Sequence, residues 1–86
     1  MKHMIETRFN VGDVIYIADH YYDYYASRTP YVVSGILIHI NNKEARVLYD
    51  VKQGKLTDRF PEYLCFSTYE ECAKWCERHN RIGGEI

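Results

Sequence analysis

The sequence predicts a mainly β protein with one α-helix: a small antiparallel barrel of four to five strands, capped by a C-terminal helix. Two observations predict this class. Short segments that alternate apolar and polar residues follow one another through most of the chain, and a capping motif then opens a segment with helical spacing. In a chain of 86 residues, these elements bury their apolar faces as one bent sheet packed against the helix. We therefore expect a single domain, with the barrel over about residues 9–66 and the helix over about residues 68–80.

Four segments carry the strand pattern, and they cover residues 14–18, 31–40, 45–51 and 56–60. The longest is rich in β-branched residues and ends at Asn41-Asn42, a pair that tolerates the positive φ of a tight turn. Gly35 predicts a bulge in it. The residues expected on the core face are Val32, Ser34, Ile36, Ile38 and Ile40, joined by Val47, Tyr49 and Val51 of the next segment. Pro61 ends the last segment because proline cannot donate to a ladder. Residues 19–30 form either a long loop or an irregular hairpin.

A capping motif predicts where the helix begins. Thr68 and Glu71 have the spacing of a capping box, in which the threonine oxygen accepts an early backbone N–H and the glutamate reaches back. An apolar stripe at helical spacing follows, made of Cys72, Ala73, Cys76 and His79, with Tyr69 and Trp75 at its margins. Gly83-Gly84 is expected to lie beyond the end of the helix.

Charge and composition narrow the function classes. Eleven basic and twelve acidic side chains give a formal charge of −1, whereas strong non-specific nucleic-acid binding needs a surplus of Lys and Arg. The sequence offers neither a signal peptide nor an apolar run long enough to span a bilayer, so we expect a soluble, cytoplasmic protein that does not act at a membrane. Three cysteines, an odd number, indicate reduced thiols. No cofactor is expected.

The outlier in the composition is tyrosine, with nine residues, four of them in one short stretch. The four are Tyr21, Tyr22, Tyr24 and Tyr25. Tyrosine is enriched at binding hot spots because it offers a large amphipathic surface with little rotamer freedom to lose. We expect at least two of these rings to contact a partner, with Asp19, Asp23 and Arg28 setting its orientation. The alternative is that two of them fold back over an open end of the barrel.

The cysteines allow a second interpretation. Cys65, Cys72, Cys76 and His79 offer four N and S ligands of the kind that tetrahedral zinc prefers. Three of them on one helix nevertheless span about two turns, near 10 Å, which is wide for bonds of about 2.3 Å. We therefore favour small core residues over metal ligands. The sequence also lacks a Gly-rich phosphate cradle and an oxyanion motif, so we expect no enzymatic activity.

A basic segment supports another alternative. Arg46, Lys52, Lys55 and Arg59 could form a patch for nucleic acid or another anion, with nearby tyrosines stacking on bases. Glu44, Asp50 and Asp58 are interleaved with these cations, which instead favours a solvated face of mixed charge. Glu62 is expected either to accept backbone N–H groups at the corner between sheet and helix or to lie in solvent.

Two segments resemble known families. Phe9-x-Val11-Gly12-Asp13-x-Ile15-Tyr16, with the long and short strands that follow, resembles the opening of SH3-like small barrels of the KOW and Tudor kind. The run from Phe60 to Cys72 resembles the tail of small proteins of bacteriophages and mobile elements, in which such a segment joins a barrel to a helix. Cys72 stands where those proteins are expected to have alanine. The resemblance covers roughly residues 9–80 and implies an SH3-like fold and a phage origin, but no activity.

These observations together predict a non-catalytic binding module. We expect an accessory or anti-defence protein that binds and occludes a host protein through the tyrosine-rich segment. One alternative is a small barrel that binds nucleic acid. Another is an oligomeric sponge for a small anionic, nucleotide-like ligand, held between subunits by arginines and aromatic rings. A homodimer through exposed strand edges is compatible with each of the three.

Overall fold

A computed structural model describes the backbone of residues 6–84 and the side chains of residues 6–80. The protein is a mainly antiparallel β structure with a single C-terminal helix. Its strands are β1 (Val14–Tyr21), β2 (Asp23–Ala26), β3 (Tyr31–Ile40), β4 (Ala45–Gln53), β5 (Leu56–Pro61) and β6 (Cys65–Phe66), with a short 3-10 helix η1 (Glu62–Leu64) and the helix α1 (Tyr69–Gly84). All four predicted strand segments are confirmed, and residues 19–30 contain a hairpin rather than a loop. No helix in the described part of the chain is long and apolar enough to cross a membrane.

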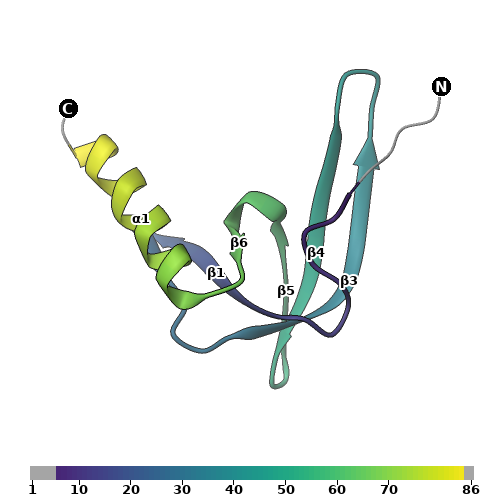
Figure 1. The fold of residues 1–86 in the computed structure, drawn as a ribbon, viewed down its shortest axis with the longest axis horizontal. Coiled ribbons are helices and arrows are strands. Elements are labelled where there is room, and N and C mark those ends of the chain that lie inside the picture. The colour runs from purple at the N-terminus through teal and green to yellow at the C-terminus, as the bar shows by residue number, and fades with distance from the viewer. Residues whose placement is uncertain (1–5, 85–86) are drawn as a thin grey trace.

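Strand β1 is shared by the two halves of the structure. It pairs with β2 along Ala18–Tyr21, with β3 at Val14 and Ile15, and with β6 at Tyr16 and Ile17. The strands β3, β4 and β5 form a meander beyond it. Figure 1 shows α1 and the β3–β4 hairpin on opposite sides of β1, with the hairpin reaching past the end of β5.

The sheet is not closed into a barrel. Its strand order is β2-β1-β3-β4-β5, with β6 on β1, and within residues 6–84 no pairing joins β5 to β6. Pro61 ends β5, and the 3-10 turn of Glu62–Leu64 carries the chain across the gap to β6. Because proline lacks an N–H and η1 bonds within itself, this corner leaves no extended backbone to complete the ring of strands.

Strand β3 contains the bulge predicted at Gly35, but its inward face differs from the predicted one. The register shifts between Val33, which pairs with Val51, and Gly35, which pairs with Asp50. Before the shift the odd-numbered side faces inward: Val33 is buried, whereas Val32 is 43% exposed. After the shift Ile36 packs on the core, whereas Ser34, Ile38 and Ile40, which were also predicted to face inward, are exposed. The extra residue exchanges the two faces, as a β-bulge does. The predicted inward set of β4 is confirmed, since Tyr49 and Val51 are buried and Val47 packs against them.

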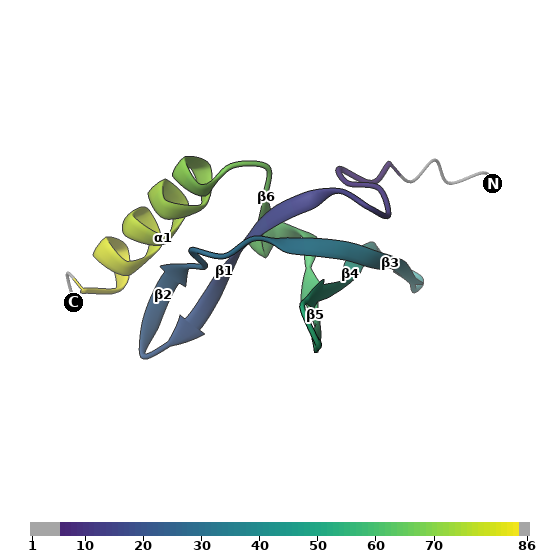
Figure 2. The same cartoon turned by 90° about the horizontal axis from the view of Figure 1, so that it is seen from below.

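Two apolar clusters lie on the two faces of β1. The larger one fills the curl of β1, β3, β4 and β5, and its buried members are Phe9, Ile15, Ile17, Val33, Tyr49, Val51, Phe60 and Cys65. The smaller one lies under α1 and contains Ala18, Phe66, Cys72 and Cys76, with Tyr16, Tyr24, Ala26, Leu64 and Trp75 packed around it. Figure 2 shows this second layer, with the β1–β2 hairpin beneath α1 and turned away from β4 and β5.

The Tyr49 hydroxyl organises the corner that the barrel leaves open. It donates to the Glu62 carboxylate over 2.5 Å and accepts the backbone N–H of Phe9 over 3.2 Å. Glu62 also accepts the backbone N–H of Arg8 over 3.0 Å. Glu62 therefore accepts one backbone N–H, as one of the two interpretations expected, but it is half-buried rather than buried and the donor belongs to the N-terminal segment. The network ties the N-terminal segment to the end of β5.

The helix begins as predicted but ends later. The Thr68 hydroxyl accepts the backbone N–H of Glu71 over 3.2 Å. The Glu71 carboxylate accepts from that hydroxyl, rather than from the Thr68 backbone. The helix then continues to Gly84, so the predicted end near Asn80 is wrong. Asn80 does not cap the helix because its side chain is bonded to β2.

Replacing Tyr49 by Phe tests the corner network. We expect Tyr49→Phe to lower the free energy of unfolding by about 1–3 kcal/mol, because Phe9 N–H and Glu62 each lose a partner. Burial and the bond to Glu62 raise the pKa of Tyr49 from 10.0 to about 12. The stabilisation that the Tyr49 hydroxyl provides is therefore fully present below pH 10, the pKa of tyrosine in the unfolded chain, and is lost as the pH rises through about 12, its pKa in the folded protein. Urea unfolding of both proteins should show their difference shrinking over that window; a constant difference would contradict the network.

Candidate functional site

The β1–β2 hairpin presents most of the tyrosine-rich segment to solvent. Tyr21 pairs with Asp23, so Tyr22 alone forms the turn between the two strands. Its φ is 64°, in the left-handed region that favours glycine, and 86% of its surface is exposed. Tyr21 is 73% exposed, and its ring contacts the Tyr22 ring edge-on at 4.7 Å. The turn therefore carries two adjacent aromatic rings.

The register divides the hairpin into two faces. Asp19 lies opposite Tyr25, and Tyr21 lies opposite Asp23, so these four side chains share one face. We call this face, together with Tyr22, the tyrosine–aspartate surface. Tyr25, like Tyr21, is exposed there. The surface alternates aromatic rings with carboxylates in both directions.

The negative charge of Asp19 raises the pKa of two nearby tyrosines. The Asp19 carboxylate raises the pKa of Tyr25, mainly through its charge and further through partial burial and a hydrogen bond. The pKa of Tyr31 is also raised, first by burial and then by Asp19. No Lys or Arg occurs from Val14 to Ser27, so nothing within the hairpin itself neutralises its two carboxylates.

Tyr24 lies on the opposite face and belongs to the protein's own interior. Its ring packs edge-on against Trp75 at 4.8 Å and against His20 at 4.9 Å. The Asn80 amide bonds both backbone groups of Tyr24, accepting its N–H over 2.9 Å and donating to its C=O over 2.7 Å. Of the four predicted contact tyrosines, Tyr24 is thus a packing residue, while the other three remain available.

The charged residues predicted to orient a partner are only partly brought together. Asp19 and Asp23 lie on the tyrosine–aspartate surface. Arg28 lies in the connection after β2, six residues beyond Tyr22, which corresponds to about 20 Å of extended chain. It therefore lies at the base of the hairpin, away from the turn.

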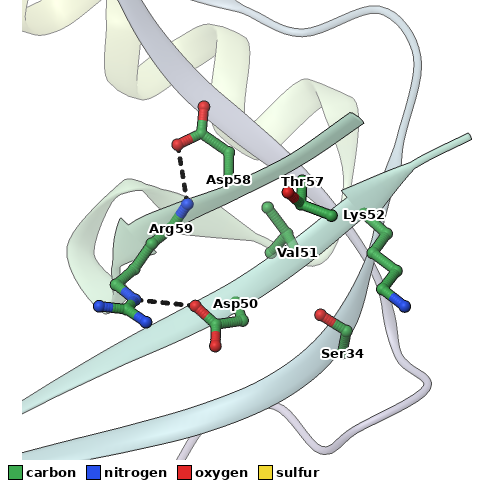
Figure 3. Close-up of a pocket in the computed structure, with 7 residues that line it drawn as sticks. All are labelled: Ser34, Asp50, Val51, Lys52, Thr57, Asp58 and Arg59. Carbon is green, nitrogen blue, oxygen red and sulfur yellow. Dashed lines mark hydrogen bonds and ion pairs between the residues drawn. The ribbon is translucent and has the colours of Figure 1, made fainter. Parts of the chain in front are cut away.

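The predicted basic patch is only partly assembled, and two of its four cations are paired with carboxylates. Arg46 donates to Glu44 and Arg59 donates to Asp50, each over 2.8 Å. Arg46 is also six residues along β4 from Lys52, about 20 Å away. Figure 3 shows the open groove around Arg59, whose guanidinium donates to Asp50, while Asp58 accepts the backbone N–H of Arg59 and Lys52 lines the same groove. Lys55 lies in the β4–β5 turn. These contacts favour the interpretation as a face of mixed charge.

The cysteines are core residues in this structure. Cys65, Cys72 and Cys76 are buried and free. Burial raises the pKa of Cys65 and of Cys72 to about 12 and also raises the pKa of Cys76. His79 instead stacks on Trp75 at 3.8 Å, and its Nδ1 lies 2.9 Å from the Trp75 carbonyl oxygen. Among residues 6–80, no three His, Cys, Asp or Glu side chains are placed to hold a metal ion.

Strand edges bear on the predicted homodimer. The outer edge of β2 is bonded by Asn80 at Tyr24. Strand β5 has β4 on one side, and no other strand of the described chain pairs with its second edge. That edge, which carries the exposed Leu56, is where a second copy could add a strand, so the homodimer stays a prediction.

Asn80 is the residue that the sequence interpretation missed. The sequence predicts only a helix end at this residue, although it continues the buried stripe of Cys72 and Cys76 at intervals of four residues. That spacing was the available signal, because residues four apart share one face of a helix. A polar amide on a buried stripe needs a partner, which here is the backbone of β2.

Comparison with known proteins finds no family model, no curated protein and no solved structure that matches this chain.

Removal of the Asn80 amide should loosen the hairpin. We expect Asn80→Ala to lower the free energy of unfolding by about 1–3 kcal/mol and to speed hydrogen exchange at the Tyr24 amide, because both backbone groups of Tyr24 lose their partner. Asn42→Ala, in the exposed β3–β4 turn, is the matched control and should change stability by less than about 0.5 kcal/mol. Equal effects of the two substitutions would contradict the role of Asn80.

The thiols should be unreactive until the protein unfolds. At pH 8 we expect labelling of native protein by a thiol-specific disulfide reagent to be at least about 100-fold slower than labelling in denaturant, because buried thiols with a raised pKa supply little thiolate. Absorbance of the released reagent measures both rates. A native cysteine that reacts as fast as free cysteine would contradict the assignment of all three to the core.

Proposed function

We propose that the protein is a non-catalytic binding module that recognises a basic surface of a partner protein through its tyrosine–aspartate surface. The observation that carries this proposal is the turn residue Tyr22, which holds a backbone conformation suited to glycine while its ring lies almost entirely in solvent. A left-handed conformation costs a non-glycine residue about 1–2 kcal/mol. The exposed ring returns no packing energy within the described chain beyond its contact with Tyr21. A partner that covers the two rings accounts for tyrosine at this position.

The chemistry of the surface favours a basic partner. Tyrosine faces attract Lys and Arg through cation–π contacts, and the intervening carboxylates of Asp19 and Asp23 attract the same cations. The hairpin carries no Lys or Arg of its own. A surface rich in arginine or lysine therefore satisfies both kinds of group at once, whereas a nucleic-acid backbone would be repelled.

Non-catalytic recognition is favoured over catalysis by the state of the reactive side chains. The three thiols are buried and have raised pKa values, so they are poor nucleophiles at neutral pH. His79 is committed to stacking on Trp75. Binding at the hairpin requires neither group.

The proposal extends to fold and origin. We assign the meander β3–β4–β5, the 3-10 turn and the return of β6 to β1 to an incompletely closed SH3-like barrel; the order of the elements and the short β6–β1 pairing support this assignment. The resemblance of residues 60–72 to phage and mobile-element proteins supports a host protein as the partner, occluded by an accessory or anti-defence factor.

Tyr22→Gly separates recognition from folding. Glycine adopts the turn conformation without strain, so we expect the free energy of unfolding to stay within about 1 kcal/mol of wild type or to rise. The ring is lost, so capture of the partner from a lysate of the host should fall by at least about tenfold, as expected for a hot-spot tyrosine. Quantitative mass spectrometry of the captured proteins measures this loss.

Tyr63→Ala is the control, because Tyr63 is also exposed but lies on η1, away from the hairpin. It should retain the partners that wild type captures. Recovery of the same proteins at equal yield by wild type and Tyr22→Gly would overturn the proposal.

A further inference from the structure

We infer that a second site, a basic groove beside α1, binds the di- or triphosphate group of a small ligand. The groove is lined by three cations, Arg8, Lys74 and Arg78, with the aromatic side chains of Phe66, Trp75 and His79 and the carboxylate of Glu71. Residues far apart in the sequence form this groove, since Arg8 precedes β1 whereas Lys74 and Arg78 belong to α1. This inference is independent of the proposed function, because the groove contains no residue of the tyrosine–aspartate surface.

Positive side chains outnumber carboxylates in this groove by three to one. Among residues 6–80, Arg46 pairs with Glu44 and Arg59 pairs with Asp50, and neither pair involves the groove. Glu71 carries the one carboxylate of the groove, and it accepts a hydrogen bond from Thr68. Three positive charges and one negative charge leave the groove with a local charge of +2, in a chain whose formal net charge is −1.

Two segments of the chain bring these cations to one groove. Lys74 and Arg78 are four residues apart, so they share one face of α1, where Glu70 and Glu71 precede Lys74 by four and three residues and offset the repulsion between the two cations. Arg8 adds a third positive charge from the N-terminal segment. A bound polyanion can accept hydrogen bonds from all three cations together.

Size and donor chemistry favour a phosphate group over a protein segment. The groove has a volume of about 260 Å³, at the small end of ligand sites, which suits a pyrophosphate-sized group rather than a peptide. Two guanidinium groups offer the planar, paired donors that match phosphate oxygens, and an ammonium supplies a point charge. Several charges on neighbouring phosphates match several cations, whereas a single carboxylate would leave two of them unpaired.

Trp75 makes the site directly measurable, because it is the single tryptophan of the chain and lines the groove. We expect titration of the full-length protein with pyrophosphate at low ionic strength to change the tryptophan fluorescence saturably. Lys74→Gln/Arg78→Gln should weaken this binding by at least about tenfold, since two of three charged contacts are lost. Calorimetry with the same probe confirms the stoichiometry.

A charge-matched control and a second probe make the test decisive. Lys43→Gln/Lys52→Gln removes the same charge from the exposed β3–β4 hairpin and should leave the affinity within about twofold of wild type. ATP in place of pyrophosphate should bind the same groove with the same dependence on Lys74 and Arg78. The inference is overturned by an absence of saturable binding, by equal losses in the two double variants, or by tighter binding of a hexaglutamate peptide than of pyrophosphate. Capture of a protein partner by the hairpin is unaffected by each of these outcomes.

Discussion

The pairing of the Asn80 side chain with the backbone of Tyr24 is the interaction on which the exposed surface of the hairpin depends. A two-stranded hairpin is marginally stable in water unless one face is packed. Asn80 supplies a donor and an acceptor to the outer edge of β2, as a neighbouring strand would, and Trp75 packs against the Tyr24 ring. With its edge bonded and one face covered, the hairpin keeps its shape while its other face and turn stay in solvent. The rigid support also explains how a strained tyrosine turn is tolerated.

Two separate cores make this arrangement possible. The larger cluster stabilises the curl of the meander, and the Tyr49 hydroxyl ties that curl to the N-terminal segment through Phe9 and Glu62. The smaller cluster attaches α1 to β1 and β2. Because β1 belongs to both, the hairpin is anchored at its base by one core and along its length by the other. Neither apolar cluster contains the tyrosine rings of the turn. The residues that stabilise the fold are therefore different from the residues that face solvent at the turn.

Local patterns predicted the strands and the helix start well, because alternation and the Thr68 cap are encoded over a few residues. The later helix end was missed because it depends on a contact between Asn80 and Tyr24 that spans 56 residues. Gly35 correctly predicted the bulge of β3, but the predicted inward face was wrong at Val32 before the bulge and at Ile38 and Ile40 beyond it, because the face and length of a strand that pack on the core depend on the elements that cover it. The excess of aromatic rings over core space predicted exposed tyrosines. The inward side chain of Tyr24 could not be assigned, because it requires knowing that Tyr22 alone makes the turn.

Net charge was the least informative of the sequence observations, and the structure shows why. A formal charge of −1 suggests a surface without preference for either sign, yet charges of like sign gather in two places. Asp19 and Asp23 gather on the hairpin, while Arg8, Lys74 and Arg78 gather beside α1. Since charges act over about a Debye length, roughly 8–10 Å at ordinary ionic strength, each patch presents its own sign to an approaching molecule. The sum over the chain therefore argues against strong non-specific binding to a long polyanion, but it does not bear on a compact anion or a basic protein surface that meets only one of the two patches.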